Sequence, residues 1–94
     1  MEGYLYVTQI NSTIFRVGRC KKLEPQMKRD DRRGHNFVFG SLTENVELKE
    51  KLIHEQLKNY KRIAYGKKCY ERGYAEILKL IIQIENDLRI ESKK

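Results

Sequence analysis

The chain has 94 residues, and 20 Lys and Arg against 13 Asp and Glu give it a formal net charge of +7. A chain of this length has room for one small hydrophobic core, and a second core within it is excluded. No stretch approaches the roughly 18–20 apolar residues of a membrane-spanning helix. The positive charge favours a polyanionic partner, either nucleic acid or an acidic membrane surface, although basic residues also serve solubility alone.

The N-terminal residues and the cysteines indicate the compartment. The chain begins MEGYLYV, which lacks the basic region and apolar run of a secretory signal. Cys20 and Cys69 have no CxxC spacing, and two cysteines and two histidines far apart do not make a zinc site. We therefore expect reduced thiols in a cytoplasmic protein that is not secreted.

The first twenty residues predict a β-hairpin. Residues 4–8 and 14–17 are rich in aromatic and β-branched side chains, and a polar segment with the turn formers Asn11 and Ser12 joins them. Side chains alternate between the two faces of a strand. One face of this hairpin is therefore expected to be apolar: Leu5, Val7, Phe15 and Val17.

The other face of the hairpin carries polar groups. Tyr6 and Arg16 are expected side by side there, next to Gly18. Backbone at a glycine can approach a ligand closely. A phenol and a guanidinium in such a place indicate a surface that binds or reacts.

Residues 19–33 are the most basic part of the sequence, with seven cations against three acids. Pro25 suits the first turn of a short helix that runs to about residue 33, and Gly34 would end it. The alternative is a solvated loop with charges of both signs. The cations are Arg19, Lys21, Lys22, Lys28, Arg29, Arg32 and Arg33.

The remaining elements are one strand and two helices. Residues 35–42 predict a third strand, with Phe37 and Phe39 on one face. A helix is expected from about residue 43 to Tyr60 or Tyr65, and a last helix from about residue 70 to 90.

Two motifs in the hairpin resemble the GIY-YIG nuclease superfamily, closest to its T5orf172 subgroup of phages and large DNA viruses. GYLYV at residues 3–7 is similar to the first motif, with Tyr6 on its conserved tyrosine. RVGR at residues 16–19 is similar to the second, which in this subgroup often reads K-I/V-G-R-T/S. The order β-β-α-β-α-α also matches. The resemblance implies one α+β domain over residues 1–94, with a three-stranded antiparallel sheet flanked by about three helices, its strands near residues 4–9, 14–19 and 36–41.

Glu50 interrupts the apolar stripe of the expected second helix. At about 100° per residue it lies on the same face as Val46 and Ile53. A glutamate in such a stripe is costly to bury unless it meets a cation or a metal. The alternative is a helix rotated so that Leu48 and Leu52 face inward and Glu50 lies at the rim.

The family resemblance assigns a role to this glutamate. In the T5orf172 subgroup the helix carries a pattern like E-x-x-I/L-H, and EKLIH at residues 50–54 matches it. The resemblance implies that Glu50 holds one divalent metal, Mg²⁺ or Mn²⁺, with His54 in the same site. One carboxylate is chemically enough, because Mg²⁺ keeps waters and takes phosphate oxygens. Tyr6 would orient or deprotonate the attacking water, and a basic group would hold the scissile phosphate.

The chain departs from the superfamily at two positions. Arg16 replaces the tyrosine of the second motif, as is usual for the subgroup. The arginine expected in the first helix is Gln26 here, and Arg29, nearly one turn further on, could substitute for it. The implied catalytic residues are Tyr6, Arg16, Arg29, Glu50 and His54.

These observations favour a metal-dependent, endonuclease-like domain that cleaves DNA, inside the host cell if it is viral. DNA would be contacted mostly through its phosphates, by Arg19, Lys21, Lys22, Lys28, Arg32 and Arg33. No membrane association is expected, and the oligomeric state is open. The alternatives are a catalytically inactive relative that binds nucleic acid and a viral protein–protein adaptor.

Four tyrosines lie among basic residues in the second half of the chain: Tyr60, Tyr65, Tyr70 and Tyr74. Aromatic side chains among cations can stack on bases. More often such tyrosines cover a small core while the hydroxyl reaches water. We favour this packing role.

Overall fold

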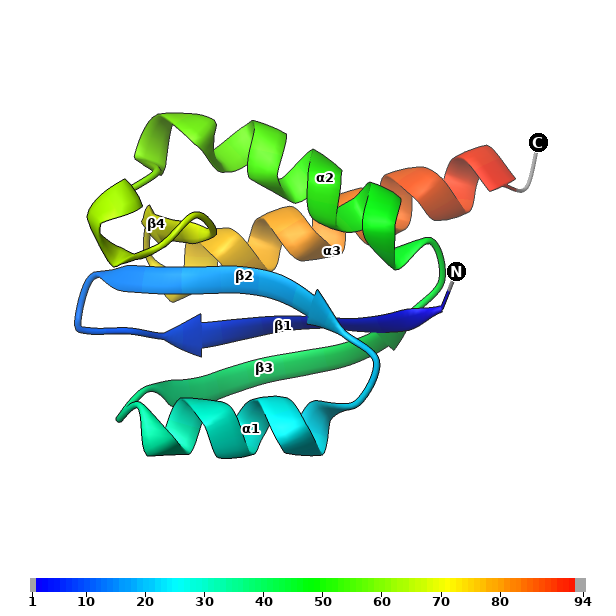
Figure 1. Cartoon of the computed structure of the whole chain (residues 1–94). Helices are drawn as coiled ribbons and strands as arrows, with labels where there is room; N and C mark the ends of the chain where they lie inside the picture. The colour runs from blue at the N-terminus through cyan, green and yellow to red at the C-terminus, as the bar shows by residue number, and fades with distance from the viewer. Residues whose placement is uncertain (1, 93–94) are drawn as a thin grey trace.

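The computed structural model describes residues 2–92, and their side chains as far as Leu88. Figure 1 shows the helices and strands in chain order. They are β1 (Gly3–Gln9), β2 (Ile14–Cys20), α1 (Leu23–Arg32), β3 (Asn36–Thr43), α2 (Val46–Leu57), the 3-10 turns η1 (Lys58–Tyr60) and η2 (Ile63–Tyr65), β4 (Cys69–Glu71) and α3 (Tyr74–Ser92).

The strands form one antiparallel sheet in the order β3-β1-β2-β4 (Figure 1). The predicted α+β class and the central place of the β1–β2 hairpin are confirmed. The predicted turn is present as well, because the side-chain oxygen of Asn11 accepts hydrogen bonds from the backbone N–H of Thr13 at 2.9 Å and of Ile14 at 3.0 Å. Hydrogen bonds from the backbone two and three residues further on to the Asn11 side chain fix the shape of the turn and so hold the two strands in register.

The prediction of three strands is wrong, because β4 adds a fourth. β4 pairs residues 69–71 with Ile14, Phe15 and Arg16 of β2. Three residues are too few for an alternating pattern, and the sequence suggested a helix from about residue 70 instead. The pairing supplies partners for the backbone at the outer edge of β2, and α3 begins only at Tyr74. Likewise α2 ends at Leu57, short of the expected Tyr60.

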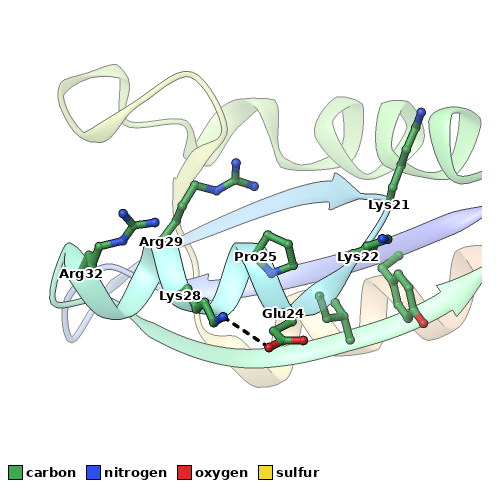
Figure 2. A pocket seen from close by; sticks show the side chains of 9 residues that line it. Lys21, Lys22, Glu24, Pro25, Lys28, Arg29 and Arg32 are labelled. Atoms are coloured by element: carbon green, nitrogen blue, oxygen red, sulfur yellow. Dashed lines mark ion pairs between the residues drawn. The ribbon is translucent and has the colours of Figure 1, made fainter.

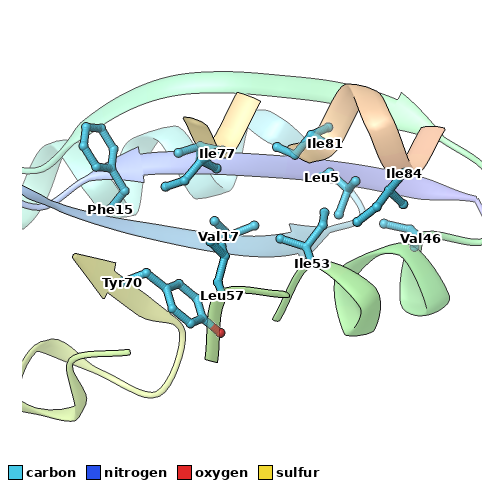
Figure 3. Packing of buried hydrophobic residues seen from close by; sticks show 11 residues of the cluster. Leu5, Phe15, Val17, Val46, Ile53, Leu57, Tyr70, Ile77, Ile81 and Ile84 are labelled. Atoms are coloured by element: carbon cyan, nitrogen blue, oxygen red, sulfur yellow. The ribbon is translucent and has the colours of Figure 1, made fainter. Parts of the chain in front are cut away.

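Helices cover both faces of the sheet (Figure 1). α2 and α3 pack on one face and enclose the hydrophobic core, shown in Figure 3. The expected apolar face of the hairpin lies in this core, with Leu5, Val7, Phe15 and Val17 all 5% exposed or less. Lys49 joins the two helices, since its Nζ lies 2.9 Å from Glu85 of α3. α1 lies on the opposite face.

A β-bulge separates the two aromatic residues of β3. Val7 pairs with Phe39 and Thr8 with Phe37, so the register shifts by one residue between them. The expectation that both phenylalanines share a face is therefore wrong. Phe39 packs against the core, and Phe37 stacks on Tyr6 on the α1 face, with ring centroids 6.2 Å apart.

Among the residues that the structure describes, no helix is both long enough and apolar enough to cross a bilayer.

Candidate nucleic-acid interface and predicted catalytic residues

Tyr6 lies where the first motif predicts, on the polar face of the hairpin, but its ring is buried to 7% exposure. Gly18 is opposite it on β2. A Cβ at position 18 would come within 2.6 Å of the Tyr6 hydroxyl, so the glycine makes room for this phenol rather than for a ligand. Burial raises the pKa of Tyr6, although the charge of Arg16 opposes the shift. Tyr6 therefore keeps its proton at neutral pH and is better suited to donate a hydrogen bond than to act as a base.

Arg16 is engaged by an aspartate that the sequence did not single out. Asp30 of α1 is fully buried and accepts hydrogen bonds from Thr8 at 2.6 Å, Arg16 at 2.7 Å and Gln26 at 3.1 Å. The Arg16 guanidinium is thus neutralised within the fold. A signal was present, because Gln26 and Asp30 are four residues apart and so share one helix face.

Gln26, at the position where the superfamily has arginine, connects this network to Arg29. Its side-chain oxygen accepts a hydrogen bond from Arg29 at 2.9 Å while its amide group donates to Asp30. Gln26 is itself buried. Arg29 is therefore held in one orientation at the surface of α1. Whether it substitutes for the expected arginine stays a prediction.

Glu50, on α2, is paired with one cation from β2 and one from the segment before β4. Its two carboxylate oxygens lie 3.3 Å from Arg19 and 3.1 Å from Lys68. Burial alone would raise the pKa of Glu50, but His54 and Lys68 outweigh it and lower the pKa to about 2. The rotated-helix alternative does not hold, because Leu48 is 46% exposed while Glu50 is 8% exposed.

His54 lies between Glu50 and the core. One ring nitrogen, Nδ1, shares a hydrogen bond with the hydroxyl of Tyr70, and the other, Nε2, lies 3.8 Å from Glu50. Burial, then the charge of Glu50, raises the pKa of Tyr70 to about 12, so the hydroxyl keeps its proton and can donate it to Nδ1.

The sheet separates the predicted catalytic residues. Tyr6, Arg16 and Arg29 belong to the α1 face, whereas Glu50 and His54 are on α2, which covers the opposite face. Both oxygens of Glu50 are already paired with cations, and no group of three or more His, Cys, Asp or Glu side chains that could hold a metal occurs in the described part of the chain. In this arrangement the residues around Glu50 do not fit a divalent cation such as Mg²⁺ or Mn²⁺.

The predicted DNA-binding residues lie closer together than the predicted catalytic residues do. A groove of about 820 Å³ runs along α1 and the segment that joins β2 to it (Figure 2). We call it the α1 groove. It is lined by Tyr4, Lys21, Lys22, Leu23, Glu24, Pro25, Lys28, Arg29 and Arg32.

The α1 groove is strongly positive. Five of its lining residues are cations and one is an acid. That acid, Glu24, is 80% exposed and 3.4 Å from Lys28. Arg19 does not line the groove, because it points to the α2 side and pairs with Glu47 and Glu50. Arg33 follows the last residue of α1.

No family model matches the chain, and no curated protein or solved structure matches it either. The resemblance to the GIY-YIG superfamily therefore stays an interpretation of the motifs.

Proposed function

We propose that this domain binds nucleic acid, DNA in the first place, through the α1 groove, by contacts to phosphates that do not depend on base sequence. The observation that carries the proposal is the groove itself, a concave surface with five cations and one exposed carboxylate. Contacts between Lys or Arg and phosphates supply most non-specific affinity for DNA and carry no sequence information.

The hydrogen bonds beneath the groove support the same function. Asp30 is buried under α1 and its charge is compensated by Arg16, so it does not repel a phosphate. Gln26 orients the Arg29 guanidinium from below. An arginine that is already oriented loses less side-chain freedom when it binds a phosphate.

The test removes two cations of the groove. Lys28→Ala with Arg32→Ala should weaken binding to a duplex of about 20 base pairs roughly tenfold, and should lower the slope of log affinity against log salt by about 2. Fluorescence anisotropy between about 50 and 200 mM salt measures both quantities. The matched control is Lys51→Ala with Lys79→Ala, which changes the net charge equally at exposed positions on α2 and α3.

An equal loss in both double variants would mean that overall charge, and not the groove, attracts DNA. Absence of wild-type binding even at low salt would favour the protein–protein adaptor. Cleavage of DNA by the same domain stays a prediction of the resemblance.

A further inference from the structure

The connection between α2 and β4 is a second basic surface, separate from the α1 groove. We call residues 58–68 the 58–68 loop. It contains five cations and no acid: Lys58, Lys61, Arg62, Lys67 and Lys68. Arg62 pairs with Glu71 at 2.7 Å and Lys68 with Glu50 at 3.1 Å.

Two large apolar side chains lie exposed in the middle of this loop. Ile63 is 75% exposed and Tyr65 is 50% exposed. The packing role expected for the tyrosines is confirmed for the other three, because Tyr70 is buried and Tyr60 and Tyr74 pack against the core. Tyr65 is the exception.

The exposed pair is held on ordered backbone. In η2, the N–H of Tyr65 donates to Arg62 at 3.1 Å and the N–H of Gly66 donates to Ile63 at 3.0 Å. Cys69 bonds to the carbonyl of Tyr65 at 3.2 Å. Exposing Ile63 and Tyr65 costs free energy in water, so a structured tip that presents them indicates a surface that becomes covered.

The loop is anchored beside the strand that leads to the α1 groove. The N–H of Val17 in β2 donates to the carbonyl of Lys68 at 3.1 Å, and Arg16 pairs with Cys69. β2 continues directly into Lys21 and Lys22 of the groove. The longest dimension of the domain is 43 Å, which about 13 base pairs span at roughly 3.4 Å each.

We propose that the 58–68 loop is a second contact to the same nucleic acid, in which Ile63 and Tyr65 insert against the bases of a duplex while the flanking lysines contact phosphates. The inference rests on the proposed function of the α1 groove. Apolar side chains that enter a base step unstack it partly and kink the duplex by about 20–90°. Aromatic rings add stacking on bases.

An anionic membrane is the other surface that a basic loop with an apolar tip suits. A flat bilayer cannot follow the concave α1 groove, whereas the backbone of a polynucleotide can lie in it. A polynucleotide therefore suits both basic surfaces, and a membrane suits only one.

The first experiment separates apolar from ionic contacts. Ile63→Ser with Tyr65→Ser should lower affinity for a duplex roughly tenfold. The slope of log affinity against log salt should not change, because apolar side chains do not contribute to the release of counterions from DNA. The bend of an end-labelled duplex, measured by energy transfer, should be lost as well. The control is Leu48→Ser with Ile82→Ser, at two residues that are 46% and 53% exposed on α2 and α3.

The second experiment places a reporter at the tip. The chain has no tryptophan, so Tyr65→Trp introduces a single tryptophan, whose emission can be excited apart from that of the tyrosines. DNA should quench its emission, and inorganic polyphosphate, a polyanion without bases, should bind without quenching. The emission of Ile82→Trp should change neither with DNA nor with polyphosphate.

The outcomes distinguish the two proposals. Absence of wild-type binding to DNA overturns both. Suppose that Lys28→Ala with Arg32→Ala weakens DNA binding, while the loop variant (Ile63→Ser with Tyr65→Ser) binds DNA as tightly as its control and DNA does not quench the tryptophan at position 65. The groove proposal then stands and the loop inference is wrong. It is also wrong if Ile63 and Tyr65 are needed for binding to phosphatidylserine vesicles and not for binding to DNA.

Discussion

Asp30 illustrates how much of the α1 face depends on one residue. It is a fully buried carboxylate that accepts hydrogen bonds from three side chains on β1, β2 and α1, including the guanidinium of Arg16. A buried ion pair contributes little net stability compared with an apolar pair, but removing one partner leaves the other charge uncompensated. The network therefore makes α1 dependent on a single carboxylate.

We expect Asp30→Ala to lower the free energy of unfolding by about 3–5 kcal/mol, because Arg16 loses its counter-charge in a buried place. Urea unfolding followed by circular dichroism measures the change. Combining Asp30→Ala with Arg16→Met should cost clearly less than the sum of the two single changes. Simple additivity in this cycle would show that the two side chains are not coupled.

The second residue-scale prediction concerns acid stability. The pKa of Glu50 falls from 4.5 to about 2 on folding, because Lys68 and His54 outweigh the effect of burial, with Arg19 also close. A depressed carboxyl pKa stabilises the fold above the unfolded value, so this stabilisation is present above pH 4.5 and is lost as the pH falls toward 2.

Glu50→Gln should therefore reduce stability at neutral pH, by up to about 3 kcal/mol, and should flatten the dependence of stability on pH in the acid range. Urea unfolding at a series of pH values checks both effects. An unchanged acid profile in Glu50→Gln would show that Glu50 titrates with an ordinary pKa.

At the scale of elements, the α1 face of the hairpin is closely packed around Tyr6. The Tyr6 ring fills the space over Gly18, and Phe37 covers Tyr6 from β3. Gly40 is close to Leu23 of α1 in the same way, since a Cβ there would come within 2.8 Å of that side chain. The side chains of Tyr6 and Leu23 can thus lie close to the sheet backbone only because positions 18 and 40 are glycines.

Gly18→Ala should destabilise the domain by about 1–3 kcal/mol, because the added methyl group overlaps the Tyr6 phenol and forces the ring to move. Thermal unfolding measures the loss, and Tyr6→Leu in the same chain should recover part of it. Gly73→Ala is the control, since a Cβ at that position meets nothing within 4 Å. Equal effects at positions 18 and 73 would contradict this account.

At the scale of the whole molecule, charge is distributed unevenly around the sheet. Cations gather in the α1 groove and in the 58–68 loop, although Lys68 of the loop is paired with Glu50, as Arg19 is. The two halves of the predicted catalytic site lie on opposite faces. Catalysis by a single centre needs these groups within reach of one phosphate.

We therefore expect DNA to be bound without Mg²⁺- or Mn²⁺-dependent nicking, as seen by incubating supercoiled plasmid with the domain. Glu50→Ala should be less stable than wild type, because Arg19 and Lys68 lose their partner. Metal-dependent nicking that Glu50→Ala abolishes, in a variant that still folds, would contradict this expectation and support the endonuclease.

Local patterns in the sequence determined the β1–β2 hairpin, its apolar and polar faces, and the helix within the basic segment. Each of these features depends on residues only a few positions apart. The short strand β4 and the bulge in β3 could not be predicted, since pairing with distant strands creates them. The same holds for the site. Counting cations identified the basic segment, but only the tertiary structure decided that Lys28 and Arg32 line an open groove while Arg16 and Arg19 are neutralised by Asp30 and Glu50. Whether a charge is available to a ligand depends on which opposite charge the fold brings within about 4 Å of it.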